Sequence, residues 1–194
     1  MYMVGAGILP VSIYKNQLYF LFGKENKFED FAPGWADFGG GQDNQESLLE
    51  IAIREGTEET TGFLGSYDDI RKMLKKHGTF TIDVERYRTH IFPMEYDEKL
   101  PYYYNNNQRF LQKKLPDNVI KNTKIFEKSE IKWIPASSLK RVKPQFRSFY
   151  QRVVESIIDK MPEINRFVLG SDSRSHNRRR TSKKQATRKN IHIL

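Results

Sequence analysis

Short apolar segments alternate with polar turns over the first 40 residues of the chain. Residues 4–14 and 17–24 are rich in β-branched and aromatic side chains, and Lys15 and Asn16 separate them. Two polar residues between two such segments suit the turn of a β-hairpin, so this pattern predicts a hairpin. A polar loop is expected over residues 26–33, and residues 35–38 predict a short strand that leads into three consecutive glycines.

A helical pattern follows the glycines. Apolar side chains recur at steps of three and four, which predicts a helix face that packs on the core: Leu49, Ala52, Ile53 and Gly56. Asp43 stands where an N-cap is expected, and Glu46 follows three residues later, as in a capping box. A glycine inside a helix costs about 1 kcal/mol relative to alanine. A close approach of helix and sheet at Gly56 would explain why it is tolerated.

The middle of the chain predicts a short helix, a strand pair and an insert. Residues 67–76 have a helical pattern that ends at His77-Gly78, and residues 79–95 are rich in β-formers. The latter predict a strand pair or one long strand, on which His90 is a structural residue. Residues 96–118 are dense in tyrosine and asparagine, and residues 107–114 within them have helical character.

The remainder predicts a strand, a turn and a final amphipathic helix. Residues 124–134 predict the strand, residues 138–141 the turn, and residues 145–160 the helix, with an apolar face made by Phe146, Phe149, Val153 and Ile157. Strands and helices therefore alternate. This order indicates an α/β fold with a mixed sheet between helices.

Length and charge divide the chain into two parts. With 194 residues it is most simply one domain, residues 1–169, followed by a tail, residues 170–194. The segment 171–194 has eight Lys or Arg against one acid, so it carries +7 of the total net charge of +9. It has almost no apolar residue, and we expect it to be disordered.

Composition also bears on the compartment. The chain has no cysteine, so it has neither disulfides nor thiolate metal ligands, which fits a reducing compartment. No stretch approaches the ~20 apolar residues that span a bilayer, so we expect no membrane partner. The apolar start of the chain lacks a basic segment and is interrupted by Pro10, so it is interpreted as a strand rather than a signal peptide.

Three glutamates share one face of the predicted helix that follows the glycines. Glu55, Glu58 and Glu59 lie at steps of three and four, and we expect this face to point away from the core. Carboxylates gathered in this way repel one another unless solvent or a divalent cation lies between them. Carboxylate oxygens are hard ligands that suit Mg²⁺ or Mn²⁺.

The segment resembles the Nudix box, G-x5-E-x7-R-E-U-x-E-E-x-G-U with U aliphatic. Six fixed positions match without a gap: Gly40, Glu46, Arg54, Glu55, Glu58 and Glu59. Gly56 replaces an aliphatic residue, and Thr61 replaces the closing glycine, which comes one residue late as Gly62. Neither departure changes a carboxylate. The resemblance implies an α/β/α sandwich and a hydrolase that cleaves nucleoside diphosphates linked to another moiety.

The resemblance also implies roles for residues. Metal ligands are expected at Glu55, Glu58 and Glu59, with a backbone carbonyl from Gly40, and the ion is Mg²⁺ or Mn²⁺. Arg54 would hold carboxylates in place, since it can pair with Glu58 across one helical turn. The catalytic set is expected to comprise Glu55, Glu58, Arg54 and a general base. The base is either a box glutamate or one from the loop before a later strand. In that loop Glu127 is the first candidate for the base or for an extra metal ligand, and Glu130 is the second.

Candidate substrate-binding residues are Lys24, Trp35 and Phe38. Trp35 and Trp133 are interpreted as core or sheet-face residues rather than as platforms on which a base stacks. The run Tyr102-Tyr103-Tyr104 either stacks on a nucleobase or forms a surface loop with partly buried rings.

The nature of the substrate stays open at this point. Residues 31–64 resemble Nudix proteins of large DNA viruses, among which are enzymes that remove mRNA caps and enzymes that act on diphosphoinositol polyphosphates or nucleotides. The basic tail favours a long anionic substrate, which inclines the prediction towards capped or otherwise RNA-linked diphosphates. A Nudix fold that only binds RNA or regulates is the contrasting hypothesis. We expect a cytoplasmic protein, in the host cytoplasm if the chain is viral, and the tail also allows a nuclear location.

Overall fold

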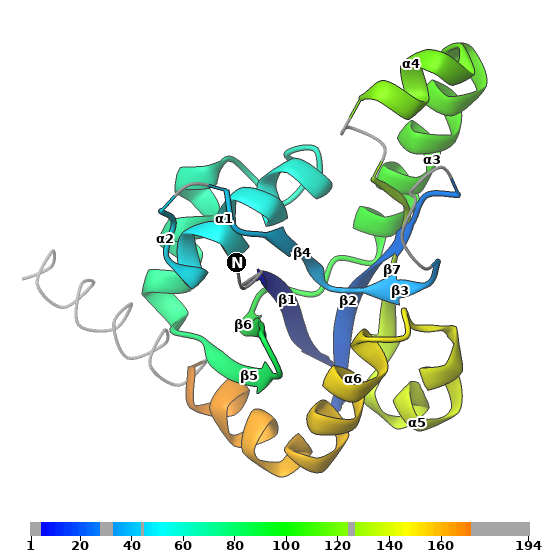
Figure 1. The fold of residues 1–194 in the computed structure, drawn as a ribbon. Helices are drawn as coiled ribbons and strands as arrows, with labels where there is room; N and C mark the ends of the chain where they lie inside the picture. Colours follow the sequence, from blue (N-terminus) through cyan, green and yellow to red (C-terminus); the bar gives the residue numbers. More distant parts are fainter. Residues whose placement is uncertain (1–4, 28–32, 44, 124–126, 172–194) are drawn as a thin grey trace, which may run out of the picture.

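A mixed β-sheet forms the centre of the molecule, and helices lie on both of its faces (Figure 1). The computed structural model describes residues 5–27, 33–43, 45–123 and 127–171. Its strands are β1 (Gly5–Tyr14), β2 (Gln17–Glu25), β3 (Trp35–Ala36), β4 (Phe38–Gly41), β5 (Phe80–Val84), β6 (Tyr87–Pro93) and β7 (Lys128–Pro135). The predicted α/β class with a mixed sheet is confirmed.

The helices are α1 (Leu48–Glu59), α2 (Tyr67–His77), α3 (Lys99–Lys114), α4 (Asp117–Asn122), α5 (Leu139–Val142) and α6 (Tyr150–Asp159). Two single 3₁₀ turns flank α5, and residues 161–171 form a further helix after α6. This last helix continues across residue 170, where the tail was expected to begin. Residues 172–194, which include almost all of the predicted tail, lie outside the described residues. None of the helices in the described ranges has the length and apolarity that crossing a bilayer requires.

The sheet is built around the predicted hairpin. β1 and β2 pair in antiparallel register, and Lys15 and Asn16 turn the chain with φ of 48° and 60°. The strand order is β3, β2, β1, β6, β5, while β4 pairs with β1 and β7 pairs with β2. β1 and β6 are parallel and the other pairs are antiparallel, so the sheet is mixed.

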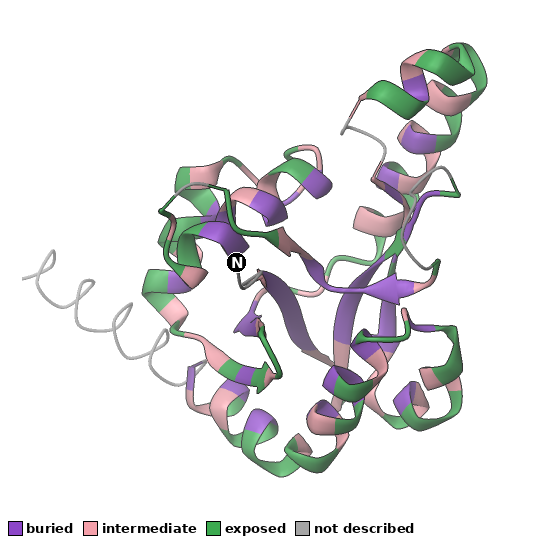
Figure 2. Cartoon of the chain, viewed as in Figure 1, coloured by how far each residue is buried: buried purple, intermediate pink, exposed green. Residues whose placement is uncertain are grey.

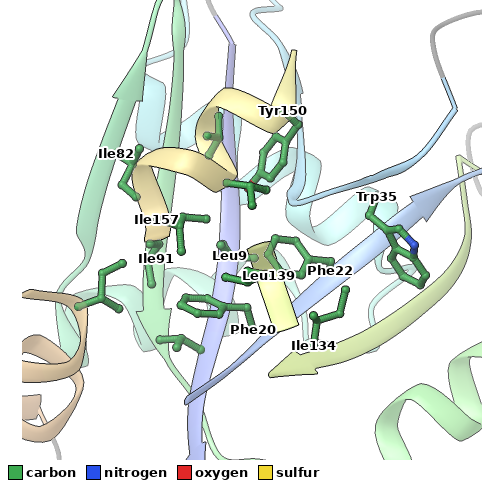
Figure 3. Packing of buried hydrophobic residues seen from close by; sticks show 14 of the residues in the cluster. Leu9, Phe20, Phe22, Trp35, Ile82, Ile91, Ile134, Leu139, Tyr150 and Ile157 are labelled. Atoms are coloured by element: carbon green, nitrogen blue, oxygen red, sulfur yellow. The ribbon is translucent and has the colours of Figure 1, made fainter. Parts of the chain in front are cut away.

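Alternating side chains divide the core into two layers, one on each face of the sheet. Leu9, Phe20 and Phe22 point to the face that α5, α6 and the helix of residues 161–171 cover (Figure 3). Ala6, Ile8 and Leu21 point to the opposite face, which α1 and α2 cover. The period of two along β1 and β2 thus produces the α/β/α arrangement.

Two of the predicted elements change at their ends. Residues 35–38 are two strands, β3 and β4, because the chain leaves β2 at Asp37 and pairs with β1 from Phe38 onward. In the C-terminal helix Phe149 is 42% exposed, and Tyr150 takes the buried position that the sequence pattern gave to Phe149. The helix begins at Tyr150 because a 3₁₀ turn precedes it at Lys143–Gln145.

Helix α1 begins later than predicted. Its N-cap is Ser47, whose hydroxyl accepts from the Glu50 N–H while the Glu50 carboxylate accepts from the Ser47 N–H. The prediction of Asp43 as N-cap was therefore wrong, and Glu46 is left to contact Arg54 instead. Leu49 is also 40% exposed, and Ile51 is buried in its place.

Helix α3 is twice as long as the helical segment predicted within residues 96–118. Its Tyr and Asn residues have low intrinsic helix propensity, but tertiary contacts stabilise them. The Asn105 side chain donates to the Ile131 carbonyl at 3.1 Å and accepts from the Ile131 N–H at 2.8 Å, so it satisfies the free edge of β7. Together α3 and α4 project from the body of the molecule (Figure 1).

Candidate active site

Three carboxylates from two segments meet beside the glycine strand β4. Glu55 and Glu59 come from α1, and Glu127 comes from the loop before β7. One oxygen of each lies within 4.8 Å of the other two. The three are therefore close enough to share one cation, and we call them the carboxylate cluster.

The glycines of β4 allow α1 to approach the strand closely. A Cβ at Gly40 would lie 2.6 Å from the carboxyl carbon of Glu55, so any larger residue there would displace the Glu55 carboxylate. The Gly39 N–H donates to Oε2 of Glu59 at 2.8 Å. The glycine strand thus binds the Glu59 carboxylate through its backbone and leaves room for the Glu55 carboxylate beside it.

The acidic face of α1 was expected to point away from the core, but two of its three glutamates are buried. Glu55 is 8% exposed and Glu59 is 4% exposed. Glu58 lies outside the carboxylate cluster: its side chain is 43% exposed, and its Oε2 is 3.4 Å from Nη1 of Arg54. In the structure, β4 and β7 cover two of the three glutamates and leave the third in solvent. Helical spacing alone could not predict this difference.

Arg54 links the acidic residues of the box. Its Nε is 2.9 Å from Glu46, its Nη1 is 2.8 Å from Glu55, and its Nη2 donates to the Gly41 carbonyl at 3.0 Å. The pairing with Arg54 lowers the pKa of Glu46 below its usual range. These contacts fit the role of holding carboxylates that was predicted for Arg54.

A buried lysine lies behind the carboxylate cluster, and sequence reasoning missed it. The Lys128 side chain is 0% exposed, and its Nζ is 3.0 Å from Oε1 of Glu59 and also contacts Oε1 of Glu25. Arg147 contacts the same Glu25 oxygen at 2.8 Å. Lys128 stands in a charged loop sequence, and only the pairing of β7 with β2, which sets it opposite Glu25, brings it inside.

Burial and mutual charge shift the pKa values of this group. Burial raises the pKa of Glu59 well above its usual range; Lys128 counteracts this rise, and the negative charge of Glu25 adds to it. Burial alone would lower the pKa of Lys128, but Glu59 and Glu25 outweigh burial and raise it. A fixed internal cation therefore supports a group of carboxylates that would otherwise repel one another.

A second buried acid, Asp37, lies on the other side of the glycine strand. The Tyr87 hydroxyl donates to Oδ1 at 2.7 Å, and the Thr89 hydroxyl donates to Oδ2 at 2.8 Å. Burial raises the pKa of Asp37 to about 6, although both hydroxyls act in the opposite direction. A Cβ at Gly7 would lie 2.6 Å from this carboxylate, so the missing side chain of Gly7 makes room for it.

The structure places the three candidate substrate-binding residues differently. Lys24 is exposed, lies 5.9 Å from the centre of the Trp35 ring, and is 3.9 Å from the Glu130 carboxylate. Trp35 is 7% exposed and Phe38 is 0% exposed, and each packs in one of the two core layers. Both therefore have structural roles, and Phe38 has no surface to offer a ligand. Glu130 pairs with Lys24, away from the cluster that Glu127 joins.

His90 has the structural role predicted for it. It is 5% exposed on β6, and its Nδ1 is 3.5 Å from the Thr79 hydroxyl. Burial lowers the pKa of His90 to about 4. The imidazole is therefore neutral near pH 7.

No family model matches the sequence, and no curated protein matches it. Among solved structures, the chain is similar to a Nudix hydrolase of M. smegmatis, RenU (13% identity, 83% of this chain and 87% of that chain, TM-score 0.48). It is also similar to an Ap4A hydrolase of C. elegans (13% identity, 84% and 99%, TM-score 0.47). A third similar structure is a MutT protein of Methanosarcina mazei (16% identity, 83% and 95%, TM-score 0.46). Likeness at this level does not assign an activity to the chain.

Proposed function

We propose that the chain is a Nudix-type hydrolase that cleaves the pyrophosphate linkage of a nucleoside diphosphate joined to another moiety. The observation that carries this proposal is the carboxylate cluster of Glu55, Glu59 and Glu127 beside Gly40. Two of these residues are fixed positions of the Nudix box, and the third comes from the loop that the resemblance offers as one of two sources of the general base. Box and loop are 68 residues apart or more in sequence, and the fold brings them together.

The donor set fits Mg²⁺ or Mn²⁺. Carboxylate oxygens are hard ligands, and one oxygen of each of the three residues lies within 4.8 Å of the other two. Two of the three residues are buried, where gathering negative charge is costly. Glu55 and Glu59 would hold the ion from α1, with the Gly40 carbonyl as a further ligand; Glu127 from the opposite loop would be a ligand as well if Glu58 is the base. When bound, the ion supplies charge that balances a diphosphate and polarises its phosphorus–oxygen bonds.

The chain's own residues would divide the reaction as follows. A water molecule attacks one phosphorus, the bond from that phosphorus to the bridging oxygen breaks, and Glu127 accepts the proton of the water. Glu58, which reaches solvent, is the alternative proton acceptor. Arg54 is a positioning residue, because its contacts are to Glu46, Glu55 and the Gly41 carbonyl.

Within this class we propose an RNA-linked diphosphate as substrate, such as an mRNA cap. The support is the charge of residues 171–194, which carry +7 of the net +9 and would attract a polyanion. Diphosphoinositol polyphosphates and free nucleotides are the alternative substrates. A Nudix module that binds RNA without cleaving it is the alternative function.

The test is hydrolysis of three substrates by the full chain in the presence of Mg²⁺ or Mn²⁺. Capped RNA, a diadenosine polyphosphate and a diphosphoinositol polyphosphate are incubated with wild type and Glu55→Gln. Loss of a carboxylate that stabilises the transition state through the ion should lower the rate at least about 100-fold. Glu163→Gln, an exposed glutamate on the last helix, is the matched control and should retain the wild-type rate.

The outcomes separate the alternatives. Cleavage of capped RNA alone supports the RNA-linked substrate, and cleavage of another member of the panel corrects it. If no substrate is cleaved with either metal while RNA still binds, the chain is a binding module. Equal rates for Glu55→Gln and wild type would show that hydrolysis does not occur at this cluster.

A further inference from the structure

Helix α3 has one face on the body of the molecule and one face in solvent. Tyr104 and Gln108 on the inner face are both 0% exposed, and the Tyr104 hydroxyl donates to the Glu59 carbonyl at 2.9 Å. The outer face carries Tyr102, Tyr103 and Phe110, which are 63%, 57% and 59% exposed. Figure 2 shows exposed residues along the outer side of α3 and α4 as they project from the sheet.

The three aromatic residues lie on one face of the helix. At about 100° per residue, positions 102, 103, 106, 110 and 113 fall within about 100° of one another, opposite Tyr104 and Gln108. Tyr102 and Tyr103 are in edge contact, with ring centroids 5.3 Å apart. We call Tyr102, Tyr103, Phe110 and the cations beside them the outer α3 face.

Cations alternate with these rings. Arg109, Lys113 and Lys114 are exposed, and Nζ of Lys114 lies 6.0 Å from the centre of the Phe110 ring. Helix α3 contains no Asp or Glu, so its four Lys and Arg residues are not balanced within the helix. Large apolar rings are costly to leave in water, so exposed rings of this kind indicate a binding surface. Because cations lie beside the three rings, the expected partner carries negative charge and has flat rings of its own.

We propose that the outer α3 face binds single-stranded nucleic acid. Bases stack on tyrosine and phenylalanine rings whatever their sequence, and the phosphates between them pair with Lys and Arg. A protein partner of acidic surface would match the cations but would leave the spacing of rings and cations without a role. The face is positive and aromatic over about three helical turns, which matches a few stacked nucleotides.

The position of α3 connects this surface to the carboxylate cluster. The Tyr104 hydroxyl contacts the backbone carbonyls of Glu59 and Lys128, and Asn105 pairs with β7 at Ile131. A nucleic-acid strand bound to α3 is thus held by the helix that packs directly against the carboxylate cluster. The consequence for substrate rests on the proposed function: the moiety joined to the diphosphate is then a polynucleotide.

The test is binding of fluorescent 12-nucleotide RNA and DNA strands to the full chain, followed by anisotropy. EDTA is present, so no hydrolysis takes place and binding is measured independently of the proposed activity. Loss of two stacked bases in Tyr102→Ala/Phe110→Ala should weaken binding at least about 10-fold. Lys113→Ala/Lys114→Ala should lower the slope of log affinity against log salt by about 1.4, which corresponds to two phosphate contacts.

Matched controls come from other surfaces. Leu169→Ala removes an exposed apolar side chain from the last helix, and Lys75→Ala/Lys76→Ala removes two exposed cations from α2. Both should bind as wild type does. Circular dichroism and thermal unfolding confirm that each variant is folded. RNA bound more tightly than DNA identifies RNA as the ligand, and equal affinities identify single strands in general.

Three results would overturn the proposal. The first is that Tyr102→Ala/Phe110→Ala binds nucleic acid as tightly as wild type does. The second is that both control variants weaken binding as much as the α3 variants do. Alternatively, Tyr102→Ala/Phe110→Ala converts a dimer to a monomer in sedimentation without changing nucleic-acid affinity, which would make the face a self-association surface. Failure of hydrolysis in the substrate panel would leave the binding result in place, so the two proposals fail separately.

Discussion

Lys128 is the residue on which the charge balance of the site depends. It is fully buried between Glu25 and Glu59, and Arg147 supplies the second cation of the group. Removing one partner of a buried ion pair is costly, because the charge left behind has neither water nor a counterion. Both glutamates would lose their shared cation at once.

We therefore predict that Lys128→Met lowers the free energy of unfolding by about 3–5 kcal/mol near pH 7.5. Lys132→Met is the matched control, because Lys132 lies on the same strand but is exposed, and it should change stability little. Urea unfolding measures both. A loss below about 1 kcal/mol for Lys128→Met would show that the group does not need its cation.

Asp37 should make stability depend on pH. Burial raises its pKa from 3.8 to about 6, so the folded state holds the proton more tightly than the unfolded chain. The stability that Asp37 adds is therefore complete below about pH 4 and is lost as pH rises to about 6. The difference amounts to about 3 kcal/mol. Asp37→Asn should gain stability relative to wild type as pH rises through this range.

His90 should act with the opposite sign. Burial lowers its pKa from 6.5 to about 4, so its contribution is present above pH 6.5 and is lost as pH falls to about 4. His90→Gln should gain stability relative to wild type on acidification. Urea unfolding of the three proteins at several pH values tests both residues. Variants whose stability parallels that of wild type at every pH would contradict these assignments.

The residues of the box could be predicted from sequence, and their supports could not. Motif spacing and the loop before a strand nominate Glu55, Glu59 and Glu127, and the structure brings these three together; Glu58, nominated by the same spacing, lies outside the group. Lys128 and Asp37 are single charged residues without a local pattern. Their burial follows from strand pairing between segments more than 40 residues apart in the sequence, which no local pattern contains.

At the scale of elements, α1 shows how close packing outweighs helix propensity. A Cβ at Gly56 would lie 2.6 Å from Cγ1 of Ile8, which is fully buried on β1. The close approach of helix and sheet that the sequence suggested at Gly56 is confirmed. This contact brings the next helical turn, with Glu59, against Gly39.

Gly56→Ala should consequently destabilise the protein. Alanine would gain about 1 kcal/mol of helix propensity, but overpacking against Ile8 should cost up to about 3 kcal/mol, so we expect a net loss of up to about 2 kcal/mol. In an Ile8→Ala background the clash is absent, so Gly56→Ala should become neutral or stabilising. A double-mutant cycle by urea unfolding measures this coupling. An equal cost of Gly56→Ala in both backgrounds would mean that Ile8 is not the cause.

Only the second half of helix α3 was predicted from the sequence, because its first half depends on tertiary contacts. Residues 102–107 within it are Tyr and Asn, whose local preference for a helix is weak, and they are helical because Tyr104 and Asn105 bond to α1 and β7. Contacts of this kind lie outside any local window of sequence. By contrast, α2 carries both its capping box and its terminal glycine in the sequence, and its ends agree with the prediction.

At the scale of the whole molecule, the alternation of apolar residues along the strands determines the two core layers. The order of the strands in the sheet depends instead on which strands pair with one another. The hairpin was predictable because its turn is local. The parallel pairing of β1 with β6 and the pairing of β2 with β7 were not. These two pairings place Asp37 with Tyr87, and Glu25 with Lys128, on either side of the glycine strand.

The most direct test of the account is a titration of the full chain with Mn²⁺, followed by electron paramagnetic resonance of the free ion. Wild type should bind Mn²⁺, and Glu59→Gln should weaken binding by at least about 10-fold, since it removes a buried ligand. Glu163→Gln should bind as wild type does. Absence of binding to wild type, or the same affinity in Glu59→Gln, would contradict a metal site at the carboxylate cluster.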